Sequence, residues 1–235
     1  MTALLAALIL LQAAPAQTEA DKFEAALKKF GERTYRITEK GKAVGAMTLK
    51  TRIEKDGDRK VAVLEDTVEF DVGHAAVEIN VKETAALDGL NLIFAERTAG
   101  KIEITASIRD GDAYLTVDQS QWLIRNIRNV QGELSVLRIV GMKKQEVGSA
   151  FKADVFVLES PSDELNHDFK CVAKETIEIG GKKVEAFKWE QKWKGKAIRG
   201  GESVDASIEN TYWIGADGTL LRFKIGQNEM TLDAK

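Results

Sequence analysis

The sequence predicts a mainly β protein, built as a large curved antiparallel sheet (a half-barrel or open barrel) with an N-terminal helix and a mid-chain helical segment packed on it. Three observations carry this prediction. Apolar and polar residues alternate through almost all of residues 32–118. The turns between alternating segments are short, which permits only antiparallel neighbours. The alternation then stops between residues 120 and 140, where apolar residues recur at helical spacing.

Residues 1–16 have the features of a secretory signal peptide. Ala3 to Leu11 form an apolar run, and Ala14-Pro15-Ala16 supplies a small-x-small cleavage pattern, although no Lys or Arg precedes the run. A short membrane anchor or a buried helix is the alternative, but the run is shorter than the about 18 apolar residues that a span requires. We therefore predict a signal peptide at 1–16 and a single β-rich domain at 17–235, exported to the periplasm or the extracellular space. No cysteine lies directly after the run, at the usual site of a bacterial lipid anchor, so we expect no lipid anchor and no transmembrane span in the mature chain.

The first predicted element of the mature chain is a helix from Thr18 to Phe30. Phe23, Ala26, Leu27 and Phe30 form one apolar stripe, which suits a helix docked on a sheet. Thr18 and Asp21 have the spacing of an N-terminal capping pair, and Gly31 is a fitting stop.

Residues 32–118 are predicted to form seven strands in an up-and-down meander. Hairpin turns are expected at Asp56-Gly57-Asp58 and at Asp110-Gly111. The segments 120–130 and 134–140 are predicted to be helical, with Leu123, Ile127 and Val130 on one stripe of the first.

Strand signals resume at residue 150 and continue to the end of the chain. The predicted strands cover residues 150–159, 169–179, 184–194, 206–214, 219–225 and 229–232. The basic, glycine-containing segment 195–201, with Lys196 and Arg199, is expected to be an exposed loop. With about a dozen strands and no linker rich in Pro or Ser, one continuous domain is favoured over two.

Aromatic residues are the candidates for a ligand-binding face. In the segment 184–194, Trp189 and Trp193 share one side of the predicted strand, and lysines such as Lys188 and Lys192 occupy the other. That separation, with a net charge of -3, disfavours nucleic acid as a partner. A hydrophobic small molecule or lipid is the expected partner. The candidate ligand-binding residues are Phe94, Trp122, Phe156, Trp189 and Trp193.

The sequence lacks the motifs of several common chemistries. The two histidines, His74 and His167, have no Cys or second His at ligand spacing, and each is interpreted as a turn or loop residue. No phosphate-binding loop and no calcium loop is present, so neither a metal nor a cofactor is predicted. The single cysteine, Cys171, excludes an intramolecular disulfide and is predicted to be a buried thiol. No catalytic residue is assigned.

Carboxylates are the remaining candidates for catalytic groups. Glu65, Glu69 and Glu96 lie within predicted strands, and Glu65 shares parity with Val61 and Val63. A pair of carboxyl groups across a cleft would allow glycoside-type hydrolysis. The competing interpretation, which we favour for Glu65 and Glu69, is a sheet edge that turns to solvent near its end.

The layout of residues 32–232 resembles the bacterial exported half-barrels of the lipoprotein-carrier type and related exported β-rich families of unknown function. The segments 183–189 (KVEAFKW) and 212–223 (YWIGADGTLLRF) are similar to the late hairpins of such proteins. The resemblance implies a hydrophobic concave face that holds acyl chains under a helical lid, and it brings no catalytic residues.

Three hypotheses on function follow. The first is an exported, non-enzymatic protein that binds an apolar or lipid-like ligand in a curved sheet. The second is a structural or protein-interaction module of the cell envelope, and the third is a carboxylate-dependent hydrolase. The oligomeric state and the identity of the ligand have no signal in the sequence.

Overall fold

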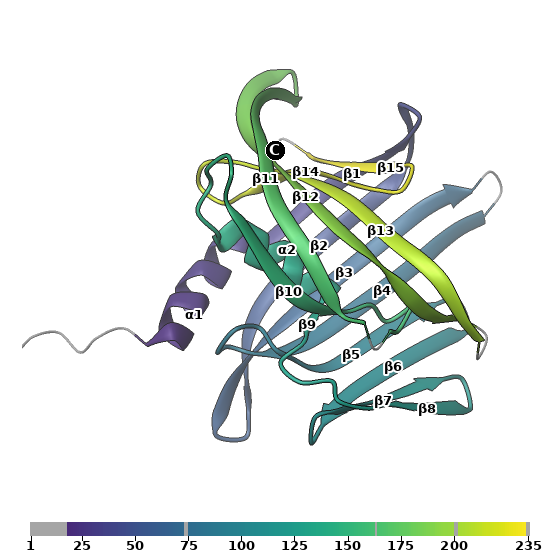
Figure 1. The fold of residues 1–235 in the computed structure, drawn as a ribbon. Coiled ribbons are helices and arrows are strands. Elements are labelled where there is room, and N and C mark those ends of the chain that lie inside the picture. The colour runs from purple at the N-terminus through teal and green to yellow at the C-terminus, as the bar shows by residue number, and fades with distance from the viewer. Residues whose placement is uncertain (1–17, 73–74, 163, 200–201, 234–235) are drawn as a thin grey trace, which may run out of the picture.

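All the strands described in the computed structural model belong to one sheet (Figure 1). The structure describes residues 18–72, 75–162, 164–199 and 202–233. The predicted signal peptide and His74 lie outside these residues. The helices are α1 (Glu19–Phe30) and α2 (Glu133–Met142). The strands of the first half are β1 (Glu32–Glu39), β2 (Lys42–Asp56), β3 (Arg59–Val72), β4 (Ala75–Ala86), β5 (Leu92–Ala99), β6 (Ile102–Arg109), β7 (Asp112–Val117) and β8 (Ser120–Ile124). Those of the second half are β9 (Gln131–Gly132), β10 (Ala150–Phe156), β11 (Asn166–Ile179), β12 (Lys182–Arg199), β13 (Glu202–Ile214), β14 (Leu220–Ile225) and β15 (Asn228–Leu232).

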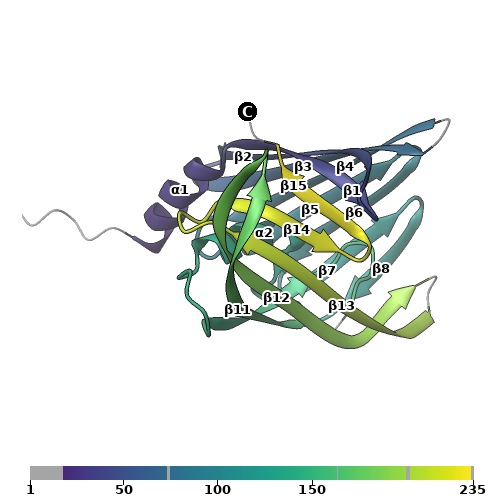
Figure 2. The same cartoon turned by 90° about the horizontal axis from the view of Figure 1, so that it is seen from above.

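The sheet is made of two meanders joined side by side. Its order is β8-β7-β6-β5-β4-β3-β2-β1-β15-β14-β13-β12-β11-β10-β9, so the halves meet where β1 pairs antiparallel with β15. Only the short β9 runs parallel to its neighbour, β10. β8 and β9 are the two edges, and the sheet is therefore open, not closed into a barrel. Figure 2 shows the sheet curving around α2, as expected for a sheet of many twisted strands. This confirms the predicted fold class.

The seven strands predicted between residues 32 and 118 are confirmed as β1 to β7, but the helix predicted for residues 120–130 is wrong. Residues 120–124 form β8, which pairs with β7 and satisfies its outer backbone groups. Asn126 and Asn129 then adopt positive φ angles of 62° and 54°, which a helix does not allow. Ile127 and Val130 are buried residues of an irregular segment, whereas Leu123 is 45% exposed on β8, so their helical spacing does not mark one shared face. Helix α2 itself, predicted at 134–140, is confirmed.

The exposed loop predicted for residues 195–201 is also wrong over its described part. β12 continues to Arg199 and pairs with β13 along its length. Gly195 is needed there because a Cβ atom would lie 2.4 Å from Glu164 Oε2 and 3.0 Å from the Trp193 ring. The glycine permits close packing within the strand, and Ala197 after it is buried.

Helix α1 lies against one end of the curved sheet (Figure 1). Thr18 and Asp21 form the predicted capping box, in which the Thr18 Oγ1 accepts from the Asp21 backbone N–H at 3.1 Å. The apolar stripe packs on the main core through the fully buried Leu27, with Phe23 and Phe30 beside it. No described helix is long and apolar enough to cross a membrane.

Helix α2 is buried inside the curve of the sheet, and a carboxylate from β4 caps its N-terminus. The residue before the helix, Gly132, has no side chain to accept the first N–H groups. Glu83 replaces it: its Oε1 accepts from Leu134 N at 2.8 Å, and its Oε2 accepts from Ser135 N at 2.9 Å and Ser135 Oγ at 3.0 Å. A carboxylate is favoured at the positive end of the helix dipole. This contact fixes the position of α2 over the sheet.

Arg138 joins the other side of α2 to β2. The Arg138 guanidinium is buried and donates to the Lys50 carbonyl, the Leu134 carbonyl and Thr51 Oγ1, each at 3.2 Å. Burial lowers the pKa of Arg138 and raises that of Glu83, and each charge opposes the shift of the other. Both oxygens of Glu83 act as acceptors, which is the pattern of an ionised carboxylate.

Replacing Glu83 by Gln should release the N-terminus of α2. The amide offers one acceptor in place of two, and its NH₂ group would face a backbone N–H of the helix. We expect the free energy of unfolding, from urea denaturation followed by circular dichroism, to fall by about 1–3 kcal/mol. Glu78→Gln, at an exposed position of the same strand, is the matched control and should change stability by less than about 0.5 kcal/mol. Equal stability of the two variants would contradict the capping role.

Candidate functional site

A cavity of about 340 Å³ lies between α2 and the concave face of the sheet. Both halves of the sheet contribute to its wall, so its shape depends on the whole fold. Its lining is mostly apolar. The apolar lining residues are Ile37, Met47, Val68, Phe70, Ile79, Val81, Leu134, Val136, Leu137, Val155, Val157, Ile208, Phe223, Ile225 and Met230. The polar lining residues are Asp66, Arg97, Glu133, Glu159, Gln191, Asn210, Tyr212 and Asn228.

The cross-strand register explains how charged side chains enter an apolar hollow. One row of residues across β2 to β5 runs Leu49, Asp66, Val81, Arg97, and it faces inward. Asp66 and Arg97 are thus separated by the intervening strand β4, two strand spacings of about 5 Å each. Arg97 instead pairs with Glu159, whose Oε1 lies 2.6 Å from Arg97 Nε.

Asp66 is the most unusual of the lining groups. Its side chain is buried, and its Oδ1 atom has no hydrogen-bond partner among the described residues. Burial raises the pKa of Asp66 to about 7, with the Glu83 carboxyl raising it further and Arg138 opposing the shift. A buried acceptor without a partner is costly, which makes Asp66 a candidate ligand contact.

Glu133, the first residue of α2, provides a second carboxyl group in the cavity. Its side chain is exposed on the open side of the cavity. Desolvation within the fold raises the pKa of Glu133 to about 8, and the neighbouring carboxyls of Glu159, Glu83 and Asp66 add to this shift while Arg97 opposes it. Two carboxyl groups with raised pKa values, Asp66 and Glu133, therefore line one cavity.

A network of neutral polar groups occupies the wall formed by β12 and β13. Gln191 Oε1 accepts from the Tyr212 hydroxyl and from Asn210 Nδ2, the latter at 3.0 Å. Gln191 Nε2 donates to His167 Nδ1 at 2.8 Å. Burial raises the pKa of Tyr212 and lowers the pKa of His167 to about 4, so the imidazole is neutral at physiological pH. His167 is thus a buried strand residue, and its prediction as a loop residue is wrong.

The five aromatic residues predicted to bind a ligand lie elsewhere. None of them is among the residues that line this cavity. Trp189 is fully buried in the main core, where its Nε1 donates to Gln145 Oε1 at 2.9 Å. Trp193 stacks on His167 with ring centroids 5.5 Å apart, and its Nε1 donates to the Glu164 carbonyl.

The other three aromatics belong to the β5–β10 side of the molecule. Phe156 is buried in a smaller core cluster beneath β5 to β8. Phe94 is half-buried on β5, and Trp122 is 37% exposed on the edge strand β8. Of the five, Trp189 alone belongs to the main core cluster among the described residues, and a ligand-binding role for any of them stays a prediction.

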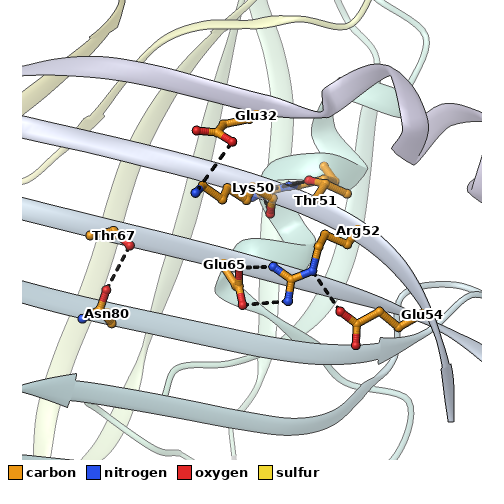
Figure 3. Close-up of polar contacts among 9 residues, drawn as sticks. Glu32, Lys50, Thr51, Arg52, Glu54, Glu65, Thr67 and Asn80 are labelled. Carbon is orange, nitrogen blue, oxygen red and sulfur yellow. Dashed lines mark hydrogen bonds and ion pairs between the residues drawn. The ribbon is translucent and has the colours of Figure 1, made fainter.

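The carboxylates singled out from the sequence face away from the cavity. Across β1 to β5, the row next to that of Asp66 runs Glu32, Lys50, Glu65, Lys82 and Glu96, with charges that alternate in sign. Such cross-strand pairs of opposite charge stabilise a solvated sheet face. Figure 3 shows part of this face, where Arg52 lies between Glu65 and Glu54. Glu69 is exposed as well. The preferred interpretation, that these acids face solvent, agrees with their positions.

Asp66 and Glu83 were missed although the sequence contains a signal for each. Asp66 alternates with Leu64 and Val68, and Glu83 alternates with Val81 and Ala85, so each acid lies on the apolar face of its strand. In β3 the signal was hidden because residues 61–64 are apolar in both registers. No comparable signal marks Glu133. The described residues contain no group of three or more side chains that could hold a metal ion.

Asp66→Asn should reduce the pH dependence of stability. Asp66 ionises near 3.8 in the unfolded chain but near 7 in the folded protein, so a rise in pH between these values favours unfolding. From pH 5 to pH 7, the wild type should lose roughly 1 kcal/mol of unfolding free energy per pH unit relative to Asp66→Asn. Urea denaturation across this range measures the difference. Asp58→Asn, in the exposed β2–β3 turn, should follow the wild type. Parallel pH profiles for wild type and Asp66→Asn would show that Asp66 is ionised in the fold.

Comparison with known proteins concerns the fold. No family model matches the sequence, and no curated protein matches it. Among solved structures, the chain is similar to a beta-barrel-like protein of the domain of unknown function DUF1849 from Brucella abortus, with a TM-score of 0.50 and 9% identity, covering 86% of this chain and 94% of that one. The hypothetical lipoprotein YmcC from Escherichia coli K12 aligns with a TM-score of 0.35 and 13% identity, over 94% of this chain and 98% of that one. The chain therefore shares its β-rich, barrel-like architecture with a bacterial protein of unknown function, and the resemblance to lipoprotein carriers stays a prediction.

Proposed function

We propose that the protein is an exported, non-enzymatic binding protein that holds an apolar or amphipathic ligand in the cavity beneath α2. The observation that carries this proposal is the cavity itself, about 340 Å³ in volume and walled by both halves of the sheet and by the helix. Sites for small molecules are typically concave, mostly apolar and supplied with a few placed polar groups, and this cavity has all three properties.

Hydrolysis by paired carboxylates is less well supported. Asp66 and Glu133 share the cavity, but their environments raise both pKa values, to about 7 and about 8. A general acid and a general base need pKa values that are pushed apart. The arrangement therefore favours binding over acid–base catalysis.

A protein-interaction module is the second candidate, and the edge strand β8 favours it. β8 has one neighbour, β7, and leaves its other side unpaired in the sheet. Tyr114, Trp122 and Leu123 are 47%, 37% and 45% exposed on this pair of strands. An unpaired edge with exposed apolar side chains can accept a further strand.

Filling the cavity should abolish ligand binding. Ile208 lines the cavity from β13 and is partly exposed, so Ile208→Trp adds bulk from the open side without enlarging the packed core. We expect the wild type to bind the neutral apolar dye N-phenyl-1-naphthylamine with increased fluorescence, and Ile208→Trp to bind it at least about tenfold more weakly. Ser207→Trp, the next residue on the opposite, exposed face, should bind like the wild type. Binding unaffected by Ile208→Trp, or absent from the wild type, would favour the interaction module instead.

Export is supported by the apolar run 3–11 and the cleavage pattern ending at Ala16. When the full-length chain is produced in a Gram-negative bacterium, we expect it in the periplasmic fraction with Gln17 as its N-terminal residue. N-terminal sequencing of the fractionated protein measures this. Leu8→Arg interrupts the apolar run and should keep the uncleaved chain in the cytoplasm. A wild-type chain that keeps Met1 in the cytoplasmic fraction would contradict export.

A further inference from the structure

The charges around the cavity do not balance. Arg97 is paired with Glu159. The buried charges of Arg138 and Glu83 offset one another. This leaves two acidic groups, Asp66 and Glu133, without an ion pair to any described basic side chain.

Asp66 lacks a hydrogen-bond donor within the described part of the chain for one of its oxygens. It is 6% exposed, lines the cavity, and has an oxygen, Oδ1, with no hydrogen-bond donor among the described residues. Buried acceptors in folded proteins are almost always satisfied by protein, water or ligand. A donor group in the cavity would satisfy this one.

Glu133 adds a second carboxyl group from the opposite wall, exposed at the open side of the cavity. It starts α2 and lines the cavity, and its side chain makes no hydrogen bond to the described residues, whereas the backbone N–H groups of the next two residues donate to Glu83. The polar groups on the β12–β13 wall differ, since Gln191, Asn210 and Tyr212 already bond to one another. Two buried polar atoms of the lining residues have no hydrogen-bond partner among the described residues, Arg97 Nε and Asp66 Oδ1. Arg97 Nε lies 2.6 Å from Glu159 Oε1 in an ion pair, so the group left without a counter-charge is the acceptor of Asp66.

We infer that the cavity is selective for a cationic amphiphile, an apolar chain that carries a primary amine placed beside Asp66 and Glu133. This inference rests on the proposed function and names its ligand class. An ammonium group brings three donors and one positive charge, which both carboxyls can accept. A fatty acid would instead add a third uncompensated acid to the same hollow, and an alcohol would bring one donor and no charge.

The ammonium group should compete with protons for these carboxyls. The groups that face them are Glu83, Glu159, Arg97, Arg138 and Tyr212. Burial and the neighbouring carboxyls raise the pKa values of the two groups and the arginines oppose this, so the empty site is partly protonated near neutral pH. Binding of the amine therefore releases protons and strengthens as pH rises from 6 to 8. A neutral ligand has no such linkage.

Isothermal titration calorimetry with three probes of equal chain length tests the inference. We expect decylamine to bind at least about tenfold more tightly than decan-1-ol at pH 8, and decanoate to bind most weakly. Decylamine affinity should rise from pH 6 to pH 8 with proton release detectable in buffers of different ionisation enthalpy, while decan-1-ol affinity stays constant.

Variants separate the two carboxyls from the cavity as a whole. Glu133→Gln and Asp66→Asn should each weaken decylamine binding by about fivefold or more and leave decan-1-ol binding within about twofold. Glu96→Gln, on the outer face, should change neither. Because decan-1-ol reports an intact cavity in every variant, retention of decylamine affinity in both variants would overturn the inference.

The outcomes for the wild type distinguish this inference from the proposed function. Equal affinity for decylamine and decan-1-ol, or preference for decanoate, overturns the cationic selectivity but leaves a binding cavity. Failure of all three probes to bind overturns both.

Discussion

The interior of this protein depends on one contact, the carboxylate of Glu83 at the N-terminus of α2. The helix lies inside the curve of the sheet, where water cannot satisfy its first N–H groups, and Gly132 has no side chain to do so. A Cβ atom at Gly132 would lie 2.2 Å from the Glu83 carboxyl carbon. The glycine and the carboxylate are therefore two halves of one cap, contributed by segments about fifty residues apart in the chain.

The far end of α2 is held as closely as the near end. Gly141 packs against the backbone of the turn between β13 and β14, where a Cβ atom would lie 2.5 Å from the Gly218 carbonyl oxygen and 3.0 Å from the Phe30 ring. A helix that is fixed at both ends cannot slide to fill the space between its side chains and the sheet. The cavity persists for this reason, and its carboxyls are a consequence of where the fixed helix and the register of β3 place them.

The two faces of the sheet differ in whether their charged side chains have partners of opposite charge. On the outer face, Lys50, Glu65 and Lys82 alternate in sign across neighbouring strands, and solvent screens what they do not neutralise. On the inner face, Asp66 is flanked by Leu49 and Val81, and nothing compensates it directly. The sheet therefore pairs its solvated charges but leaves one buried carboxyl oxygen without a hydrogen-bond donor among the described residues, at a cost in stability.

The sequence by itself determined the β-rich class, the strands of the first meander, the capped N-terminal helix and the presence of α2, because alternation, turn residues and caps act over short distances. The sequence did not predict the strands at residues 120–124 and 195–199. Pairing with β7 and with β13, respectively, determined the structure there, against the local spacing and composition. Aromatic content likewise pointed to Trp189 and Trp193, which pack the interior and do not line the cavity. Only the tertiary structure decided the candidate site: Asp66, Glu133 and Tyr212 come together through the curvature and register of one fifteen-stranded sheet, which are properties of long-range pairing and not of any short segment.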